Sequence, residues 1–305
     1  MNNRIGESQT VPIRTYGCQL LILRCKLLKK LVLFSLIVPR RIPGAFFLRN
    51  LVERRSLLFQ LVRRDFEQRF VGSAIGWIWG LIHPLALLIS WMFVFQVCMR
   101  VPPPPGVSNY PLFIFAGMLP WLLFSETVQR SAASLLDSAN LITKTVFPSE
   151  MIPVSVFLST LMSHLLALVL MIAATAVWVN QISVFLILLP LYFVVIGLLA
   201  VGLGWIVASL HVFLRDTAQV VSVVLIFWFW LTPIFITEKQ FPPWARFLLV
   251  ANPLYYVVGA YRTILLGSGV PDLEDLAIAT GYGAAMFVAG GLFFRHMKRG
   301  FADVL

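Results

Sequence analysis

Charged residues are scarce in this sequence of 305 residues. Asp, Glu, Lys and Arg together make up 12% of the chain, whereas soluble domains carry about 25%. Hydrophobic residues make up 59%, and several apolar stretches reach roughly 20 residues, the length that a helix needs to cross about 30 Å of hydrocarbon. These stretches lack the alternation with period two that marks the strands of membrane barrels. The sequence therefore predicts an all-α membrane protein.

The sequence also lacks the residue patterns that catalysis and metal binding require. No nucleophile with an adjacent base is apparent, and no paired acid and base are apparent either. The cysteines and histidines stand singly, without the spacing of metal ligands: Cys18, Cys25, Cys98, His83, His164, His211 and His296. No Gly-x-x-x-x-Gly-Lys-Ser/Thr phosphate loop occurs, and the dipeptide Gly-Lys is absent. We therefore expect a chain that is not an enzyme and that binds no metal or cofactor itself.

The formal net charge of +11 is concentrated before the first long apolar stretch. A basic segment next to a membrane span is retained in the cytosol and is attracted to anionic lipid. Binding of nucleic acid is the weaker interpretation, because no basic domain with interleaved stacking aromatics accompanies the charge. We expect a basic amino-terminal arm over residues 1–49 and no nucleic-acid partner.

Seven apolar stretches follow the arm, and one of them is not suited to crossing the membrane. They lie at about residues 74–99, 111–136, 152–178, 184–211, 219–237, 243–266 and 274–295. The tail at 296–305 is basic like the amino terminus, so both termini favour the cytosol and the number of crossings is even. The sixth stretch contains Pro243, Asn252, Pro253 and Arg262, which favours an outer re-entrant helical hairpin between spans five and six. The prediction is six transmembrane helices within residues 74–295 of a multi-pass protein of the cytoplasmic membrane.

Residues 50–73 have the pattern of an amphipathic helix at the membrane interface. Apolar side chains fall on one helical face and charged side chains lie largely opposite: Leu51, Leu58, Phe59, Val62, Phe66 and Phe70 against Glu53, Arg54, Arg63, Arg64 and Glu67. Gly72 and Ser73 then allow the chain to turn into the first span.

Five short motifs occur in order along the chain. They are Val62–Phe66 with Arg69–Trp79, Gly117–Trp121 with Phe124 and Ser125, Asn140–Ile142 with Lys144 and Pro148, Leu231–Ile234, and Asn252–Leu254 with Arg262. In this order they resemble ABC transporter permeases that export polysaccharides, over about residues 50–295. The resemblance is closer to exporters of O-antigen and teichoic acid than to the capsule branch. The arm before residue 50 departs from the family pattern.

The resemblance implies a homodimeric channel bound to two ATP-binding cassette subunits. The expected activity is the ATP-driven export of a lipid-linked polysaccharide, such as O-antigen, across the cytoplasmic membrane. The missing phosphate loop agrees with this, because ATP must then be hydrolysed by the separate ATP-binding subunit. Two alternatives are an ion-coupled secondary transporter, which needs a buried ionisable group for coupling, and a polytopic membrane glycosyltransferase, which needs an acidic metal-binding pair in a sizeable loop.

Three groups of residues are candidates for function. Aromatic side chains can form a translocation pathway for the apolar faces of sugar rings, although packing and interfacial anchoring are commoner roles: Trp77, Trp91, Trp121, Phe124, Phe227 and Trp230. Glu126 lies within a span, and Arg130 one helical turn later can form an intramembrane ion pair with it. The cytosolic segment 137–151 offers an ATPase coupling element in Asn140, Leu141, Ile142 and Lys144.

Overall fold

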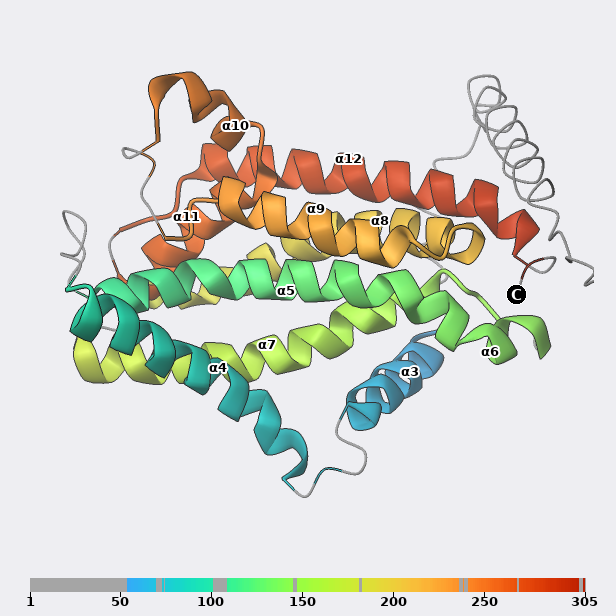
Figure 1. Cartoon of the computed structure of the whole chain (residues 1–305), viewed down its shortest axis with the longest axis horizontal. Coiled ribbons are helices and arrows are strands. Elements are labelled where there is room, and N and C mark those ends of the chain that lie inside the picture. Colours follow the sequence, from blue (N-terminus) through green and yellow to red (C-terminus); the bar gives the residue numbers. More distant parts are fainter. Residues whose placement is uncertain are drawn as a thin grey trace, which may run out of the picture. The chain divides into compact units, whose positions relative to one another are not determined.

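A computed structural model describes residues 54–69, 73, 75–100, 109–144, 147–180, 183–235, 238, 241–267, 269–301 and 304. Within these residues every regular element is helical, which confirms the all-α prediction (Figure 1). The predicted arm at 1–49 lies outside the described residues, as do residues 50–53 and 70–72 of the predicted interfacial segment. The main helices are α3 (Arg55–Gln68), α4 (Trp79–Trp91), α5 (Tyr110–Asp137), α6 (Ala139–Lys144), α7 (Met151–Trp178), α8 (Leu189–Phe213), α9 (Thr217–Leu231), α10 (Arg246–Val250), α11 (Pro253–Leu265) and α12 (Leu273–Met297).

Short helical segments of other types extend several of these helices. The segments η2 (Gly76–Ile78), η4 (Val184–Leu188), η6 (Pro243–Ala245) and η7 (Lys298–Gly300) are 3₁₀-helical, and η3 (Met92–Cys98) is π-helical. With these extensions, five helical stretches within the described residues are long and apolar enough to cross a membrane: Trp79–Cys98, Tyr110–Asp137, Met151–Trp178, Val184–Phe213 and Leu273–Gly300. Each matches one predicted apolar stretch to within a few residues.

The two remaining predicted stretches differ from the others. The fifth stretch, 219–237, is represented by α9, which has 15 residues and is apolar but shorter than the five spans. The stretch at 243–266 is divided into η6, α10 and α11 instead of forming one helix. Since α11 has 13 residues, it is only about 20 Å long and too short to cross a bilayer.

Polar residues fix where three of these helices begin. The Asn109 side chain accepts a hydrogen bond from the backbone N–H of Leu112 at 3.4 Å, and Asn252 does the same for Leu254 at 3.1 Å. Both helices have proline in the first turn, where its missing N–H costs nothing. At α12, Asp272 caps the backbone N–H of Glu274 at 2.9 Å. Acidic residues in the first turn of α12 and basic residues in its last turn match the helix dipole.

Helix α5 lies at the centre of the bundle and is the most buried of the candidate spans. It packs against α7, α8, α9 and α11, and α8 packs in turn along α12 (Figure 1). The α8 and α12 backbones touch at Gly202 and Gly290, where a Cβ atom on Gly290 would overlap the Gly202 carbonyl oxygen. Small residues of this kind allow close helix packing in membranes.

Helices α3 and α4 lie at the edge of the bundle. Helix α4 runs obliquely to α5 and packs mainly against α7, while α4 and η3 both also contact α5 (Figure 1). Helix α3 packs against α7, with Val62 buried and Leu58 packed on the hydrophobic core. Phe59, which the sequence assigns to the same apolar face, is 69% exposed. The helical part of the predicted segment at 50–73 is thus present over Arg55–Gln68.

Candidate functional site

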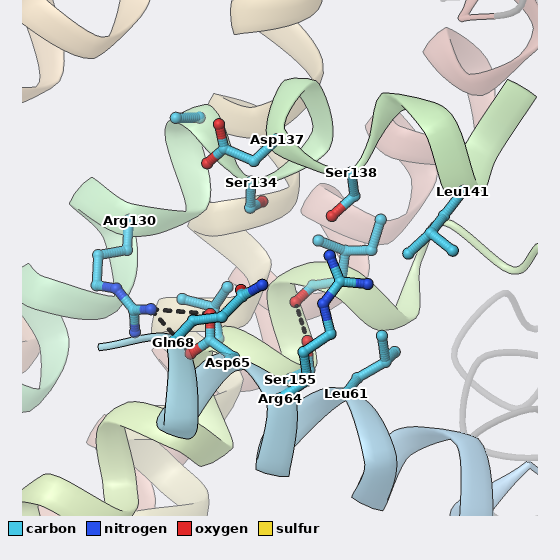
Figure 2. A pocket seen from close by; sticks show the side chains of 13 residues that line it. Leu61, Arg64, Asp65, Gln68, Arg130, Ser134, Asp137, Ser138, Leu141 and Ser155 are labelled. Carbon is cyan, nitrogen blue, oxygen red and sulfur yellow. Dashed lines mark hydrogen bonds and ion pairs between the residues drawn. The ribbon is translucent and has the colours of Figure 1, made fainter. Parts of the chain in front are cut away.

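A pocket of about 280 Å³ lies between α3, α5, α6 and α7. Figure 2 shows α3 side chains on one wall and side chains from the end of α5 and from α6 across from them. The residues that line it are Leu61, Arg64, Asp65, Gln68, Arg130, Ala133, Ser134, Asp137, Ser138, Leu141, Ile152, Ser155 and Val156. The predicted interfacial segment at 50–73 and the predicted coupling segment at 137–151 therefore border the same pocket.

An ion pair between two residues of this pocket's lining holds α3 against α5. Nη2 of Arg130 donates to both carboxylate oxygens of Asp65 at 2.8 Å (Figure 2). The two side chains are 28% and 24% exposed, so water screens the pair only in part. Nη1 of Arg130 also donates to the Thr160 hydroxyl of α7 at 3.2 Å. Asp65 and Arg130 thus join three helices.

A second ion pair lies next to the first and includes Arg69, which directly follows α3. Nη1 of Arg69 lies 3.0 Å from Oε1 of Glu126 and donates to the Ser163 hydroxyl at 2.8 Å. Nη2 of Arg69 donates to the Thr160 hydroxyl at 2.8 Å. Burial lowers the pKa of the Arg69 guanidinium, and the nearby Glu126 carboxylate opposes this shift. Asp65, Arg69, Glu126 and Arg130, which we call the charge cluster, carry no net charge together.

The structure places Glu126 and Arg130, which the sequence proposed as a pair, next to side chains of the α3 segment. Each residue has an ion-pair partner on the α3 segment: Arg69 for Glu126 and Asp65 for Arg130. The sequence placed the two residues one turn apart on one helix, but it did not show that α3 brings a cation and an anion to the same place. Both ion pairs therefore join α5 to the α3 segment.

The predicted coupling residues lie on the short helix α6. Leu141 lines the pocket, Asn140 is exposed, and Ile142 is half-buried against the hydrophobic core. The side chain of Lys144 lies outside the described part of the structure. Helix α6 follows α5 after a single residue, Ser138, and α7 begins seven residues after α6 ends. Short connections therefore link α6 to both α5 and α7 along the chain.

The predicted aromatic pathway divides into buried and exposed residues. Trp121 and Phe124 are 5% and 0% exposed and pack inside the subunit against Phe229 and Trp228. Trp91 is half-buried and packs edge-on against Phe115 and Phe235. On α9, Phe227 and Trp230 are 68% and 66% exposed. The side chain of Trp77 lies outside the described residues.

Residues from three of the sequence motifs meet at the other end of the bundle. The Arg262 guanidinium donates to the backbone carbonyls of Phe113 at 3.3 Å and Ile234 at 2.5 Å, and it lies 3.7 Å from the centre of the Phe113 ring. Gly117 leaves room for it, because a Cβ atom there would lie 2.7 Å from the guanidinium. Asn252 donates to the Thr232 hydroxyl at 3.0 Å and accepts from the Trp228 indole at the same distance. These contacts fix α11 to α5 and to the end of α9.

The family model of the ABC-2 type transporters matches residues 56–266, which is more than half of the chain. The chain belongs to the ABC-2 type transporter family. The matched range begins in α3 and ends just after α11, so it includes both the charge cluster and the motif contacts around Arg262. The family resemblance drawn from the sequence motifs is thereby confirmed.

The names of curated relatives of this ABC-2 transporter refer to the export or transport of polysaccharides. The chain is 28% identical to the O-antigen export system permease protein RfbA of Myxococcus xanthus, over 84% of its own length and 97% of that protein. It is also 28% identical to RfbA of Klebsiella pneumoniae, over 82% and 95% of the two chains. The polysialic acid transport protein KpsM of Escherichia coli is 24% identical, over 76% and 88%.

Sequence reasoning missed Asp65, Arg69 and Arg262 as structural partners. All three lie within the motifs that carry the family resemblance, so the motifs contained a signal for them. A second signal was available for Asp65 and Arg69. Glu126 and Arg130 lie in a membrane span and need partners of opposite charge, and Asp65 and Arg69 are charged residues close to a span in the sequence.

Proposed function

We propose that the chain is the permease subunit of an ATP-driven exporter of a lipid-linked polysaccharide, O-antigen or a similar polymer. The observation that carries the proposal is the match to RfbA permeases over almost their whole length, within the ABC-2 transporter family. The five long apolar helices supply the membrane-spanning part that such a subunit needs.

The energy source in this proposal is a separate ATP-binding subunit. The sequence has no phosphate loop of its own, so ATP hydrolysis must come from a partner. Two such subunits would bind a homodimer of this chain, each at the pocket between α3 and α6. Support for this location comes from Leu61 and Leu141, which offer apolar contacts, while the exposed Arg64 and Asp137 offer charges for orientation.

In the proposed topology the chain crosses the cytoplasmic membrane six times, with both termini in the cytosol. The crossing that is missing from the five long helices would be α9, the fifth in chain order, extended by the turn at Thr232–Phe235, and η6, α10 and α11 would form the re-entrant hairpin on the outer side before α12. This placement is supported by the short lengths of α10 and α11 and by the basic residues at the end of α12.

The proposed translocation pathway uses the exposed aromatic residues of α9. Phe227 and Trp230 face away from the subunit core, where a second copy of the chain or the polymer can reach them. Trp121 and Phe124 would support these residues from behind, through Phe229 and Trp228. Aromatic rings suit such a pathway because they contact the apolar faces of sugar rings without demanding one hydrogen-bond pattern.

Deletion of the gene in the native host tests the proposed function. We expect surface polysaccharide to disappear and lipid-linked polymer to accumulate on the cytosolic side, with both defects reversed by the intact gene. Cell fractionation and glycan analysis would measure the two pools. Normal surface polysaccharide in the deletion strain would contradict the proposal, and loss of polymer synthesis without accumulation would favour a glycosyltransferase.

A further inference from the structure

A second pocket, of about 200 Å³, lies beside the charge cluster between α4, α5 and α7. It is lined by Arg69, Trp79, Gly80, His83, Pro84, Leu119, Leu122, Leu123, Glu126, Thr160, Ser163, His164 and Ala167. This volume is of the order of one sugar ring or one lipid headgroup.

The surroundings of this pocket indicate that a ligand reaches it from the plane of the membrane. Trp79 and His83 of its lining are exposed, and Trp79 is 48% exposed. On α7, Met162 and Leu165 flank the lining residues and are 42% and 41% exposed. Exposed apolar side chains on membrane spans face lipid or another membrane helix. Since Glu126 and Arg69 are charged, the pocket belongs near the headgroup region and not at the bilayer centre.

The charges in the pocket favour a neutral ligand. Arg69 lies 3.0 Å from Glu126, and its two Nη atoms donate to the hydroxyls of Thr160 and Ser163, while its Nε lies 3.9 Å from the Asp65 carboxylate. A phosphate near Arg69 would meet the Glu126 carboxylate as well, and a cation near Glu126 would meet Arg69. Neither gains a net attraction from this pair, whereas a ligand with hydroxyl groups needs only hydrogen-bond partners.

Hydrogen-bond acceptors for hydroxyl groups are present in the lining. The Glu126 side chain is 42% exposed, and a carboxylate has about four lone-pair sites, more than one ion pair occupies. Pro84 lies inside α4 and has no N–H, so it cannot donate to the Gly80 carbonyl four residues earlier. His83 adds an imidazole, and Trp79 adds an aromatic ring that can cover the apolar face of a sugar.

We propose that this pocket binds a single neutral sugar ring that is attached to a membrane lipid. The natural ligand would be the lipid-proximal sugar of the exported polymer, and this assignment rests on the proposed function. The site would hold the sugar next to the charge cluster, so that movement of α3 against α5 and α7 could load or release it. Binding of the sugar headgroup itself does not require an ATP-binding subunit and can be tested on this chain alone.

Photolabelling of the full chain tests the proposal. The protein would be purified in a detergent without a sugar headgroup and placed in phosphatidylcholine nanodiscs. The probe is an alkyl β-glucoside with a diazirine at the start of its alkyl chain, and the labelled peptides are identified by mass spectrometry. We expect saturable labelling near Trp79–Pro84 or Thr160–Ala167, displaced by decyl β-glucoside or decyl N-acetyl-β-glucosaminide but not by decyl phosphate or decyl phosphocholine.

Variants of the pocket make the test specific. We expect Trp79→Leu and His83→Ala to weaken the probe's affinity, by about tenfold for Trp79, which is the loss of one aromatic contact. These two residues are exposed and lie outside the charge cluster, so their replacement should leave the fold intact. Ile89→Ala is the matched control, because Ile89 is a 55% exposed residue of the same helix that does not line the pocket.

Three results would overturn the sugar site. They are labelling that does not saturate, equal displacement by decyl phosphate or decyl phosphocholine, and affinity unchanged in both pocket variants. Displacement by decyl phosphocholine would identify a site for ordinary phospholipid headgroups. Failure of the export function would appear separately, in the gene-deletion experiment, and would not affect saturable binding of the glucoside.

Discussion

Replacing Asp65 with Asn should loosen α3 from the membrane helices. The Asp65–Arg130 pair has two contacts of 2.8 Å, and its side chains are 24% and 28% exposed. Exposed pairs contribute about 0–1 kcal/mol, while removal of one partner from a buried pair costs about 3–5 kcal/mol. Since this pair is only partly buried, we expect Asp65→Asn to lower the free energy of unfolding by about 2 kcal/mol.

The other arginine of the charge cluster adds to this cost. Arg69 and Arg130 both donate to the Thr160 hydroxyl, at 2.8 Å and 3.2 Å, so the two cations lie close together. The Asp65 carboxylate lies 3.9 Å from Arg69 and 2.8 Å from Arg130, so its negative charge offsets the repulsion between the two guanidinium groups. Without it, the repulsion between the two guanidinium groups is balanced only by Glu126.

Thermal unfolding of the purified chain measures this effect. A loss of about 2 kcal/mol corresponds to a melting temperature lower by about 4–8 °C for a domain of 150–250 residues. The matched control is Arg63→Gln on the same helix, because its pair with Glu67 at 2.7 Å is 71% and 58% exposed and should contribute less than about 0.5 kcal/mol. In a double-mutant cycle with Arg130→Gln we expect a coupling energy of about 1–2 kcal/mol. Equal melting temperatures for Asp65→Asn and the control, or a coupling energy near zero, would refute the reasoning.

Three further predictions concern packing and transport. Gly290→Ala should destabilise the α8–α12 contact by about 1–3 kcal/mol, because its Cβ would overlap the Gly202 carbonyl; Gly281→Ala, which meets open space on the same helix, should melt like the parent protein. Truncation of the buried Trp121 to Ala should cost about 3–5 kcal/mol of stability. Truncation of the exposed Trp230 should leave the melting temperature almost unchanged but lower polymer export per inserted molecule, and unchanged export would assign Trp230 to lipid contact.

The spans could be predicted because membrane insertion imposes a simple rule on the sequence. A helix such as α5 or α12 must be apolar for roughly 20 residues, whatever it packs against, so its limits are visible without tertiary information. The same rule explains why 243–266 was set apart, since its prolines and Asn252 interrupt the stretch at the positions where η6 and α11 begin.

The charge cluster could be predicted only in part, because its geometry depends on how α3 packs. Spacing along one helix suggested that Glu126 and Arg130 would pair, but a partner from another element offers better geometry, as the two contacts of 2.8 Å between Asp65 and Arg130 show. The exposure of residues on α9 could not be predicted from the sequence either, because Trp121 and Trp230 are both aromatic residues in apolar helices. Only the packing of the bundle distinguishes the buried one from the exposed one.

We proposed that a separate ATPase is coupled to this chain through α6 and the pocket beside α3, and this is tested most directly by reconstituting the chain with the ATP-binding subunit of its host. Polymer export and ATP hydrolysis would be measured together in proteoliposomes for Leu141→Asp and Lys144→Glu, with Leu141→Met as the control that keeps an apolar side chain. We predict that both charge variants insert normally but bind the ATPase more weakly or hydrolyse ATP without exporting polymer, while the control behaves like the parent protein. Normal binding and a normal ratio of export to hydrolysis in both charge variants would contradict the account.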